Sequence, residues 1–367
     1  VEVGYYDTPG YAYGVYVSGD YAYVADGCAG LRVIDVMDPS NPEEVGYYDT
    51  PGRAHGVYVS GDYAYVADGD LRVVEISDPS SPEELGYYDT PSYAEGIYVS
   101  GDYAYIADGS AGLRVIYVGD PGNPEEVGYY DTPGYAYGVY VLGDYAYVAD
   151  DRAGLRVIDV SDPQNPVEVG YYNTPGYAKG VYVSGDYAYV ADDWAGLRVI
   201  DVSAPSNPVE VGYYDTPGYA YGVYVSDGYT YVADCRAGLR VIDVSDPSNP
   251  EEVGYYDTPG WACDVYVSEG YAYVAAGYGG LRVIDVSDPS NPEEVGYYDT
   301  PGWAYGVYVL GDYAYVADWD AGLQIYQFYG VGVADTLPDK LVLYHSWPNP
   351  FTSRTCIRFA IPQVDGC

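Results

Sequence analysis

The 367 residues include 54 Tyr, 47 Gly and 26 Pro, a composition that favours strands and turns over helices. The 14 Lys and Arg residues stand against 56 Asp and Glu residues, giving a formal net charge of −42, which excludes binding to nucleic acid and to anionic membrane surfaces because that affinity comes from basic side chains. No stretch approaches the ~18 consecutive apolar residues of a membrane helix, so we expect a soluble chain without membrane insertion.

An internal repeat organises most of the chain. The motif Gly-Tyr-Tyr-(Asp/Asn)-Thr-Pro occurs with its Gly at positions 4, 46, 86, 128, 170, 212, 254 and 296. In the first copy we expect four strands, at residues 2–8, 14–17, 21–25 and 31–36, because these runs are rich in Val, Ile and Tyr. Ser18-Gly19-Asp20 predicts a tight hairpin turn, and Pro-containing segments form the loops between the other strands.

The repeat predicts the fold class. Four strands in about 42 residues, repeated without helices, are typical of one blade of a β-propeller. We therefore predict an all-β, eight-bladed β-propeller of four-stranded antiparallel blades over residues 1–330. The eighth copy ends without its last strand and the chain begins with one, so the N-terminal strand is expected to join the last blade and close the ring. An open solenoid of the same repeats is the alternative.

Loops on one side of the predicted disc vary between copies, whereas those on the other side hardly change. The varying loops open at the mouth of the central channel. Rigid scaffolds place recognition on such loops, and Tyr and Trp supply broad, stiff contact surfaces, so we predict a ligand-binding face; the alternative is that these loops vary because nothing depends on them. The candidate residues are Tyr11, Arg53, His55, Tyr93, Glu95, Tyr135, Tyr177, Lys179, Tyr219, Trp261 and Trp303 before the innermost strands, and Arg152, Trp194, Arg236 and Trp319 in the other loops.

Two further positions repeat in seven copies. The Asp that ends a strand, as at Asp26, could contribute to Ca²⁺ sites, but no copy has the close-set Asp/Asn loop of a dedicated site. We expect it instead to accept a hydrogen bond from the backbone N–H two residues further on. The Arg at the position of Arg32 is expected to pair with an acidic residue of the Asp35 type or the Asp7 type.

Other chemistry finds little support. His55 and His345 are the only histidines, and no Ser/His/Asp set or His-rich metal site can be assembled from them; no catalytic residue, metal or cofactor is predicted. Cys235 and Cys263 are expected on the same face in neighbouring blades. A disulfide would need their Cα atoms within about 7 Å, so we expect free thiols, with the bridge as the alternative.

The repeats also resemble a known family. Residues 239–247 read Leu-Arg-Val-Ile-Asp-Val-Ser-Asp-Pro, and residues 185–192 read Gly-Asp-Tyr-Ala-Tyr-Val-Ala-Asp. Together these motifs resemble the LVIVD repeat of bacterial and archaeal surface proteins, over about 330 residues. The resemblance implies a propeller on an exported protein, and it supplies no catalytic residues.

The end of the chain has a different composition. A linker at residues 331–340 leads to a segment at 341–367 that contains Pro348-Asn349-Pro350-Phe351, followed by Thr355, Ile357, Phe359 and Ile361 at fixed spacing. This pattern resembles the opening of the C-terminal sorting domains of type IX secretion in Bacteroidetes-like bacteria. The resemblance stops after 27 residues, so we expect a truncated sorting domain whose single strand has no partners.

These observations predict a monomeric, non-catalytic binding protein that is secreted or lies on the bacterial cell surface. Its partner would be an extracellular glycan or protein, recognised through the variable loops. One alternative is a structural spacer module of a larger surface protein. Another is a polysaccharide lyase or hydrolase that uses Glu95 with an Asp at the mouth, which requires the two carboxyl groups within roughly 5 to 10 Å.

Overall fold

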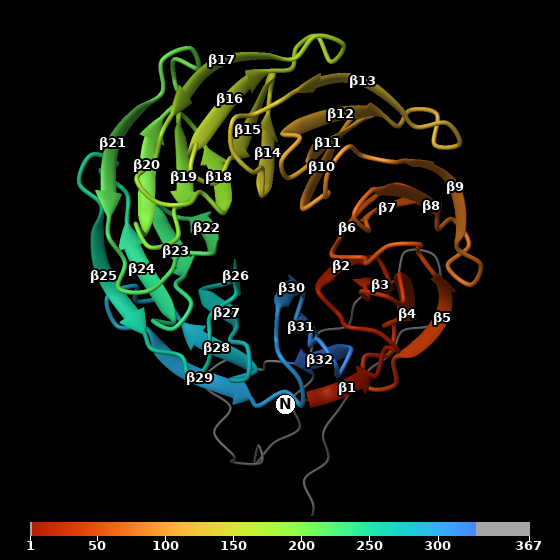
Figure 1. The fold of residues 1–367 in the computed structure, drawn as a ribbon. Helices are drawn as coiled ribbons and strands as arrows, with labels where there is room; N and C mark the ends of the chain where they lie inside the picture. The colour runs from red at the N-terminus through yellow and green to blue at the C-terminus, as the bar shows by residue number, and fades with distance from the viewer. Residues whose placement is uncertain (1, 328–367) are drawn as a thin grey trace, which may run out of the picture. The chain divides into compact units, whose positions relative to one another are not determined.

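Residues 2–327 are described by a computed structural model; the predicted linker and sorting segment lie outside them. The described part is a ring of eight four-stranded antiparallel sheets (Figure 1). The all-β, eight-bladed prediction is confirmed. Blade 1 contains β2 (Gly14–Ser18), β3 (Tyr21–Ala25), β4 (Leu31–Asp35) and β5 (Glu43–Tyr48); blade 2, β6 (Gly56–Ser60), β7 (Tyr63–Ala67), β8 (Leu71–Glu75) and β9 (Glu83–Tyr88); blade 3, β10 (Gly96–Ser100), β11 (Tyr103–Ala107), β12 (Leu113–Tyr117) and β13 (Glu125–Tyr130); blade 4, β14 (Gly138–Leu142), β15 (Tyr145–Ala149), β16 (Leu155–Asp159) and β17 (Val167–Tyr172); blade 5, β18 (Gly180–Ser184), β19 (Tyr187–Ala191), β20 (Leu197–Asp201) and β21 (Val209–Tyr214); blade 6, β22 (Gly222–Ser226), β23 (Tyr229–Ala233), β24 (Leu239–Asp243) and β25 (Glu251–Tyr256); blade 7, β26 (Asp264–Ser268), β27 (Tyr271–Ala275), β28 (Leu281–Asp285) and β29 (Glu293–Tyr298); and blade 8, β30 (Gly306–Leu310), β31 (Tyr313–Ala317), β32 (Leu323–Gln327) and β1 (Glu2–Tyr6).

The N-terminal strand closes the ring. In blade 8, β1 runs antiparallel to β32, with Glu2 opposite Tyr326 and Tyr6 opposite Leu323. Figure 1 shows this pairing as the red start of the chain lying beside its blue end. The strand that the eighth copy lacks in sequence is therefore supplied by the first residues, as predicted, and no blade is left one strand short.

Blade-to-blade packing forms the core. In each blade the second and third strands, such as β3 and β4, are almost entirely buried, while the outermost strand is partly exposed. Apolar clusters lie between neighbouring blades; one joins Tyr23, Leu31 and Val33 of blade 1 to Val66 and Val74 of blade 2. Because both sheet faces are covered, the strands are apolar on both sides, which explains the weak alternation of the sequence.

The outer strand is held by the following blade. A Cβ atom added to Gly46 in β5 would lie 2.3 Å from the carbonyl oxygen of Pro79 and 2.6 Å from Cδ of Pro82, both in the next blade. The Gly of the Gly-Tyr-Tyr motif is therefore required by this close approach. At the end of the same strand, the Tyr48 hydroxyl donates a 2.6 Å hydrogen bond to Glu84 in β9, and Tyr256 donates to Glu294 at 2.7 Å in the same way. Tyr and Glu thus link successive outer strands.

Candidate binding face

Antiparallel blades place their loops on two opposite faces of the ring. We call "variable face" the side formed by the loops between the second and third strands, as in β3 to β4, and by the segments that lead into each innermost strand. The opposite side, formed by the hairpin turns and the Asp-Pro loops, is called "acidic face". On the variable face the loop of one blade joins the segment of the next, since Gly27 and Ala54 exchange two backbone hydrogen bonds of 3.0 Å. Every predicted candidate residue therefore lies on the variable face.

In seven of the eight blades a buried Asp in the loop fastens this face; blade 7 has Ala276 at that position. In blade 5, Asp192 is fully buried and accepts hydrogen bonds from the Thr174 hydroxyl at 2.5 Å and from the Gly176 N–H at 2.8 Å. Burial raises the pKa of Asp192 to about 6, although these hydrogen bonds and Arg198 oppose the shift. The Asp residues thus tie a loop to the segment that enters the same blade, 16 to 18 residues earlier. The expected bond from the N–H two residues further on was wrong for Asp192, whose carboxylate accepts from Thr174 and Gly176 instead, but it is confirmed at Asp68, which accepts from the Asp70 N–H at 3.2 Å.

Six of the seven repeated Arg residues pair with the Asp7-type carboxylate, and Arg156 donates to Asn173 at the same position. Arg198 donates to Asp215 at 2.6 Å, and its guanidinium lies over the Tyr213 ring, with 4.7 Å between its Cζ atom and the ring centroid. Asp215 occupies the position of Asp7 in its copy. The Asp35-type alternative is wrong, because those carboxylates face the acidic side and accept hydrogen bonds within their own turns, as Asp35 does from the Met37 N–H.

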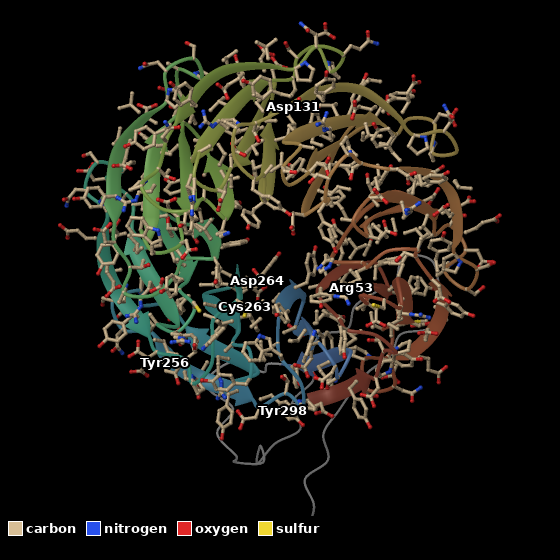
Figure 2. The ribbon with its side chains drawn as sticks, viewed as in Figure 1. Arg53, Asp131, Tyr256, Cys263, Asp264 and Tyr298 are labelled. Carbon is tan, nitrogen blue, oxygen red and sulfur yellow. The ribbon has the colours of Figure 1, made fainter. Side chains whose placement is uncertain are left out.

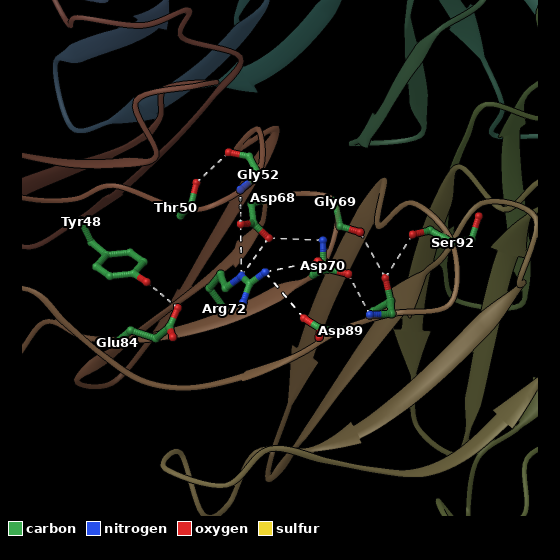
Figure 3. A network of polar contacts seen from close by, with 11 residues as sticks. Tyr48, Thr50, Gly52, Asp68, Gly69, Asp70, Arg72, Glu84, Asp89 and Ser92 are labelled. Atoms are coloured by element: carbon green, nitrogen blue, oxygen red, sulfur yellow. Dashed lines mark hydrogen bonds and ion pairs between the residues drawn. The ribbon is translucent and has the colours of Figure 1, made fainter.

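Blade 2 shows how the network adapts to a shorter loop (Figure 3). Its repeat spans 40 residues instead of 42, and Asp70 accepts the hydrogen bond from the repeated Arg that a loop carbonyl accepts in other blades, as that of Ala195 does from Arg198. The Asp70 carboxylate accepts from the Thr90 N–H at 2.9 Å and pairs with Arg72 at 3.2 Å. Arg72 also contacts the buried Asp68 at 3.1 Å. An added acidic side chain therefore replaces two missing loop residues.

The structure brings many of the predicted candidates together. Tyr11 stacks on Trp319 with 4.6 Å between ring centroids, and Glu95 accepts a 2.9 Å hydrogen bond from the Tyr135 hydroxyl. The remaining contacts form an arc of rings across the seam between the first and last blades. Its centroid separations are Trp261–Trp303 5.5 Å, Trp303–Tyr305 6.3 Å, Tyr305–Tyr13 5.5 Å, Tyr13–His55 4.5 Å and His55–Tyr93 5.6 Å.

Cationic residues lie against other rings of this face. Lys179 places its Nζ atom 3.5 Å from the centroid of Tyr137, and it pairs with Asp151 at 3.6 Å. Arg152 lies over Tyr177, with 5.2 Å from its Cζ atom to the ring centroid, and donates to the hydroxyl at 3.2 Å. Arg236 lies over Trp261 with a corresponding distance of 4.9 Å. Three candidates lie on the variable face outside these groups: Arg53, Trp194 and Tyr219.

A closed ring of tyrosines below the mouth was not predicted. Each innermost strand contributes one half-buried Tyr, and each contacts the next around the channel at centroid separations of 5.2 to 6.1 Å. Eight centroids at this spacing lie about 7 Å from the axis. Burial, reinforced by the neighbouring Tyr residues, raises the pKa of Tyr140, Tyr224 and Tyr308 to about 12. The ring members are Tyr16, Tyr58, Tyr98, Tyr140, Tyr182, Tyr224, Tyr266 and Tyr308.

Asp264 was also missed. It begins β26 of blade 7, where the other seven innermost strands begin with Gly, and it lies near the centre of the ring in Figure 2. Its carboxylate accepts hydrogen bonds from the Val265 N–H at 2.9 Å and from the Val307 N–H of blade 8 at 3.2 Å. Burial raises its pKa to about 6. The departure from Gly in the sequence was a signal that could have found it.

The described residues were also searched for metal sites, disulfides and membrane-spanning helices. No group of three or more His, Cys, Asp or Glu side chains in residues 2–327 could hold a metal ion. Cys28, Cys235 and Cys263 are free thiols, which agrees with the expectation for Cys235 and Cys263. In the same part of the chain, no helix has the length and apolar character needed to cross a membrane.

Comparisons with known proteins identify the repeat. The LVIVD repeat model matches residues 9–50, 51–90, 91–132, 133–174, 175–216, 217–258, 259–300 and 301–326. The chain therefore belongs to the LVIVD repeat family. Comparison with curated proteins finds no match.

Solved structures with a similar fold share little sequence. Sqt1 from Saccharomyces cerevisiae has a TM-score of 0.77 at 6 % identity, with 89 % of this chain and 98 % of that chain covered. The computationally designed protein Ika8 has a TM-score of 0.75 at 9 % identity, with 89 % and 99 % covered. BamB from Moraxella catarrhalis has a TM-score of 0.66 at 14 % identity, with 86 % and 94 % covered. At these identities the similarity establishes the propeller fold alone.

Proposed function

We propose that this member of the LVIVD repeat family is a non-catalytic, exported binding protein whose variable face recognises a glycan. One observation carries the proposal: an arc of aromatic rings runs without a break from Trp261 to Tyr93, over the loops of several blades. Aromatic rings present stiff apolar faces beside polar edges, and the C–H faces of sugar rings stack on such surfaces. Export rests on the resemblance of the tail to a sorting domain.

The arc is open to solvent where a ligand would approach. Tyr305 is 40 % exposed, and Tyr278, which packs edge-on against Trp303 at 5.6 Å, is 59 % exposed. Ring-to-ring packing holds these side chains in place, so little rotamer entropy is lost when a ligand binds. A pre-arranged, half-exposed aromatic surface suits a repeating sugar chain better than a single small molecule, which needs an enclosing pocket.

The position of Asp264 relative to Glu95, and the contact that Glu95 already makes, favour binding over hydrolysis. Glu95 leads into the innermost strand of blade 3 and Asp264 begins that of blade 7, on opposite sides of an eight-membered ring. A pair acting on one glycosidic bond would stand within roughly 5 to 10 Å. Glu95 is also engaged by the Tyr135 hydroxyl, and burial lowers the pKa of His55, which disfavours its charged form.

A glycan array probed with the full chain tests the proposal. We expect binding to extended polysaccharides, and a loss of affinity of about tenfold or more in a Trp261→Ala, Tyr305→Ala variant, because central aromatic residues dominate binding energy. Tyr5→Ala is the matched control, since Tyr5 is 55 % exposed but lies on the outer strand β1. Absence of any glycan binding, or equal losses in both variants, would overturn the proposal.

A further inference from the structure

The cationic residues of this acidic protein divide into two sets. Residues 2–327 contain eleven Lys and Arg. Seven are the repeated Arg residues of the blades, and each contacts at least one carboxylate. The other four all lie on the variable face: Arg53, Arg152, Lys179 and Arg236. The acidic face carries no Lys or Arg in the described part of the chain.

Three of those four have no acidic partner. Lys179 pairs with Asp151, but among residues 2–327 no carboxylate lies within ion-pair distance of Arg53, Arg152 or Arg236. All three are exposed. In a chain with a net charge of −42, acidic side chains are abundant, so guanidinium groups left without one are available for a ligand. Guanidinium binds carboxylate and sulfate through two parallel hydrogen bonds.

Aromatic rings hold two of these guanidinium groups in a fixed orientation. Arg152 rests on Tyr177 and Arg236 rests on Trp261 through the contacts described above. Stacking on a ring fixes the plane of the guanidinium while leaving N–H donors at its edge. Trp261 is also one end of the aromatic arc, so a sugar stacked there would have Arg236 beside it.

The three arginines are spread around the mouth. Arg53 leads into blade 2, Arg152 contacts the segment that leads into blade 5, and Arg236 contacts the segment that leads into blade 7. Successive sites are separated by three, two and three blades. A ligand that engages more than one of them must be extended and must carry anionic groups at intervals.

We propose that the variable face binds an acidic polysaccharide, with the unpaired Arg53, Arg152 and Arg236 holding carboxylate or sulfate groups of the chain. This inference rests on the proposed glycan recognition and adds the charge class of the ligand. Nucleic acid is not the expected ligand, because binding a phosphate backbone requires clustered basic side chains, whereas these three arginines stand two or three blades apart.

The test compares ligands that differ only in charge. The full chain is titrated with polygalacturonate and with its methyl ester, and with dextran sulfate and dextran. We expect an affinity for one charged polymer that exceeds that of its neutral counterpart by about tenfold or more. The two pairs separate carboxylate from sulfate as the recognised group. Equal binding of charged and neutral polymers would overturn this inference and leave the proposed function standing, whereas binding of no polysaccharide would overturn both.

Substitutions test whether the three arginines cause the preference for the charged polymer. Arg53→Gln, Arg152→Gln and Arg236→Gln combined should reduce affinity for the charged polymer about tenfold or more and leave binding of the neutral polymer unchanged. The control carries Ser18→Asp, Ser100→Asp and Ser184→Asp, which change the net charge by the same amount at exposed positions on the acidic face. Equal losses in the two variants would mean that net charge alone is sensed and would contradict the assignment. Self-association of the wild-type chain that the Arg variant abolishes, without any preference for charged polymers, would likewise contradict it and indicate a second copy as the ligand.

Discussion

Blade 5 carries two carboxylates with nearly identical hydrogen bonds on opposite faces. Asp192, on the variable face, accepts from one hydroxyl, that of Thr174 at 2.5 Å, and from one N–H, that of Gly176 at 2.8 Å. Asp201, on the acidic face, accepts from the Ser203 hydroxyl at 2.6 Å and the Ser203 N–H at 2.9 Å. Burial raises the pKa of Asp192 to about 6, whereas the hydrogen bonds from Ser203 lower the pKa of Asp201. Burial, rather than the number of donors, therefore decides the sign of the shift.

The same contrast extends around the ring. The variable face uses buried carboxylates to fasten loops to one another, and so it can vary its exposed residues without losing its framework. The acidic face has self-contained turns, many of which pair an Asp with a Ser, as Asp201 with Ser203 and Asp285 with Ser287, and it gathers much of the negative charge. A scaffold of this kind lets exposed loop residues change, as Cys28, Arg152 and Trp194 do at equivalent positions, while the fastening Asp is kept in seven of the eight blades.

The largest expected effect comes from removing the buried carboxylate. Asp192→Ala should lower the free energy of unfolding by about 3 kcal/mol, because it leaves the Thr174 hydroxyl and the Gly176 N–H buried without their acceptor and removes the carboxylate that lies 3.7 Å from Arg198. Asp201→Ala should lower it by less than about 0.5 kcal/mol, as is usual for surface positions. Equilibrium unfolding in guanidinium chloride measures both. Similar losses in the two variants would show that burial does not distinguish the faces.

The next largest expected effect is the pH dependence of stability, which should differ between the carboxylates of the two faces. The folded pKa of Asp26, Asp108, Asp192 and Asp234 is about 6, above the ordinary value of 3.8. A raised acid pKa stabilises the fold below the unfolded pKa, and that stability is lost as pH rises through the folded pKa. The melting temperature should therefore increase from pH 8 to pH 5, corresponding to a few kcal/mol in total.

Below pH 4 the carboxylates of the acidic face should determine how stability changes with pH. Hydrogen bonds lower the pKa of Asp201 and Asp243, so the stability that these groups contribute is present above pH 4 and is lost as pH falls through their folded pKa. Stability should thus pass through a maximum between about pH 4 and 5. Asp192→Asn is the control for general charge repulsion, because it should reduce the rise between pH 8 and pH 5. A melting temperature that is highest at pH 8 would contradict the whole scheme.

Much of this architecture was predictable, for identifiable reasons. The repeated Gly-Tyr-Tyr motif gave the blade period, and the strand at residues 2–8 predicted the ring closure. Alternation of strand direction placed the variable loops on one face without any coordinates. Each of these inferences depends on order along the chain, which sequence displays directly.

The missed features depend on spatial placement instead. Asp26 accepts from Thr8 and Gly10, and nothing in the local sequence indicates that the entering segment lies against its loop. The tyrosine ring that includes Tyr16 cannot be recognised from differences between the copies, because the residue is Tyr in all eight. Asp264 does differ between the copies, but it lies within a strand, where a change of residue does not by itself indicate a binding loop.

A smaller effect is expected from restoring Gly at the one exceptional innermost strand. Asp264→Gly should raise the free energy of unfolding by about 1 kcal/mol at pH 8, because a carboxylate with a pKa of about 6 is charged there at a cost. The flexibility of Gly in the unfolded chain offsets part of the gain. The gain should shrink at pH 5, where the carboxyl group is largely protonated. Urea unfolding at the two pH values measures it, and a loss at both would mean that the hydrogen bond to Val307 outweighs the charge.

The smallest expected effect is that of salt, and it belongs to the acidic face. Self-repulsion within a net charge of −42 should weaken as the Debye length falls to about 10 Å at 0.1 M salt, so the melting temperature should rise with NaCl at pH 7.5. Asp62, Asp102 and Asp144 occupy exposed hairpin turns on this face, and Asn is equally suited to such turns. Replacing all three with Asn should therefore raise stability at low salt and reduce its salt dependence, whereas Asp192→Asn should leave the salt dependence nearly unchanged because its charge is buried and paired.

Differential scanning fluorimetry from 20 mM to 0.5 M NaCl compares the two variants, and millimolar Ca²⁺ at constant ionic strength adds one further arm. A rise with Ca²⁺ beyond that of NaCl would indicate cation binding at the surface, and equal salt slopes in both variants would show that the charges of the two faces are not distinguished by their exposure.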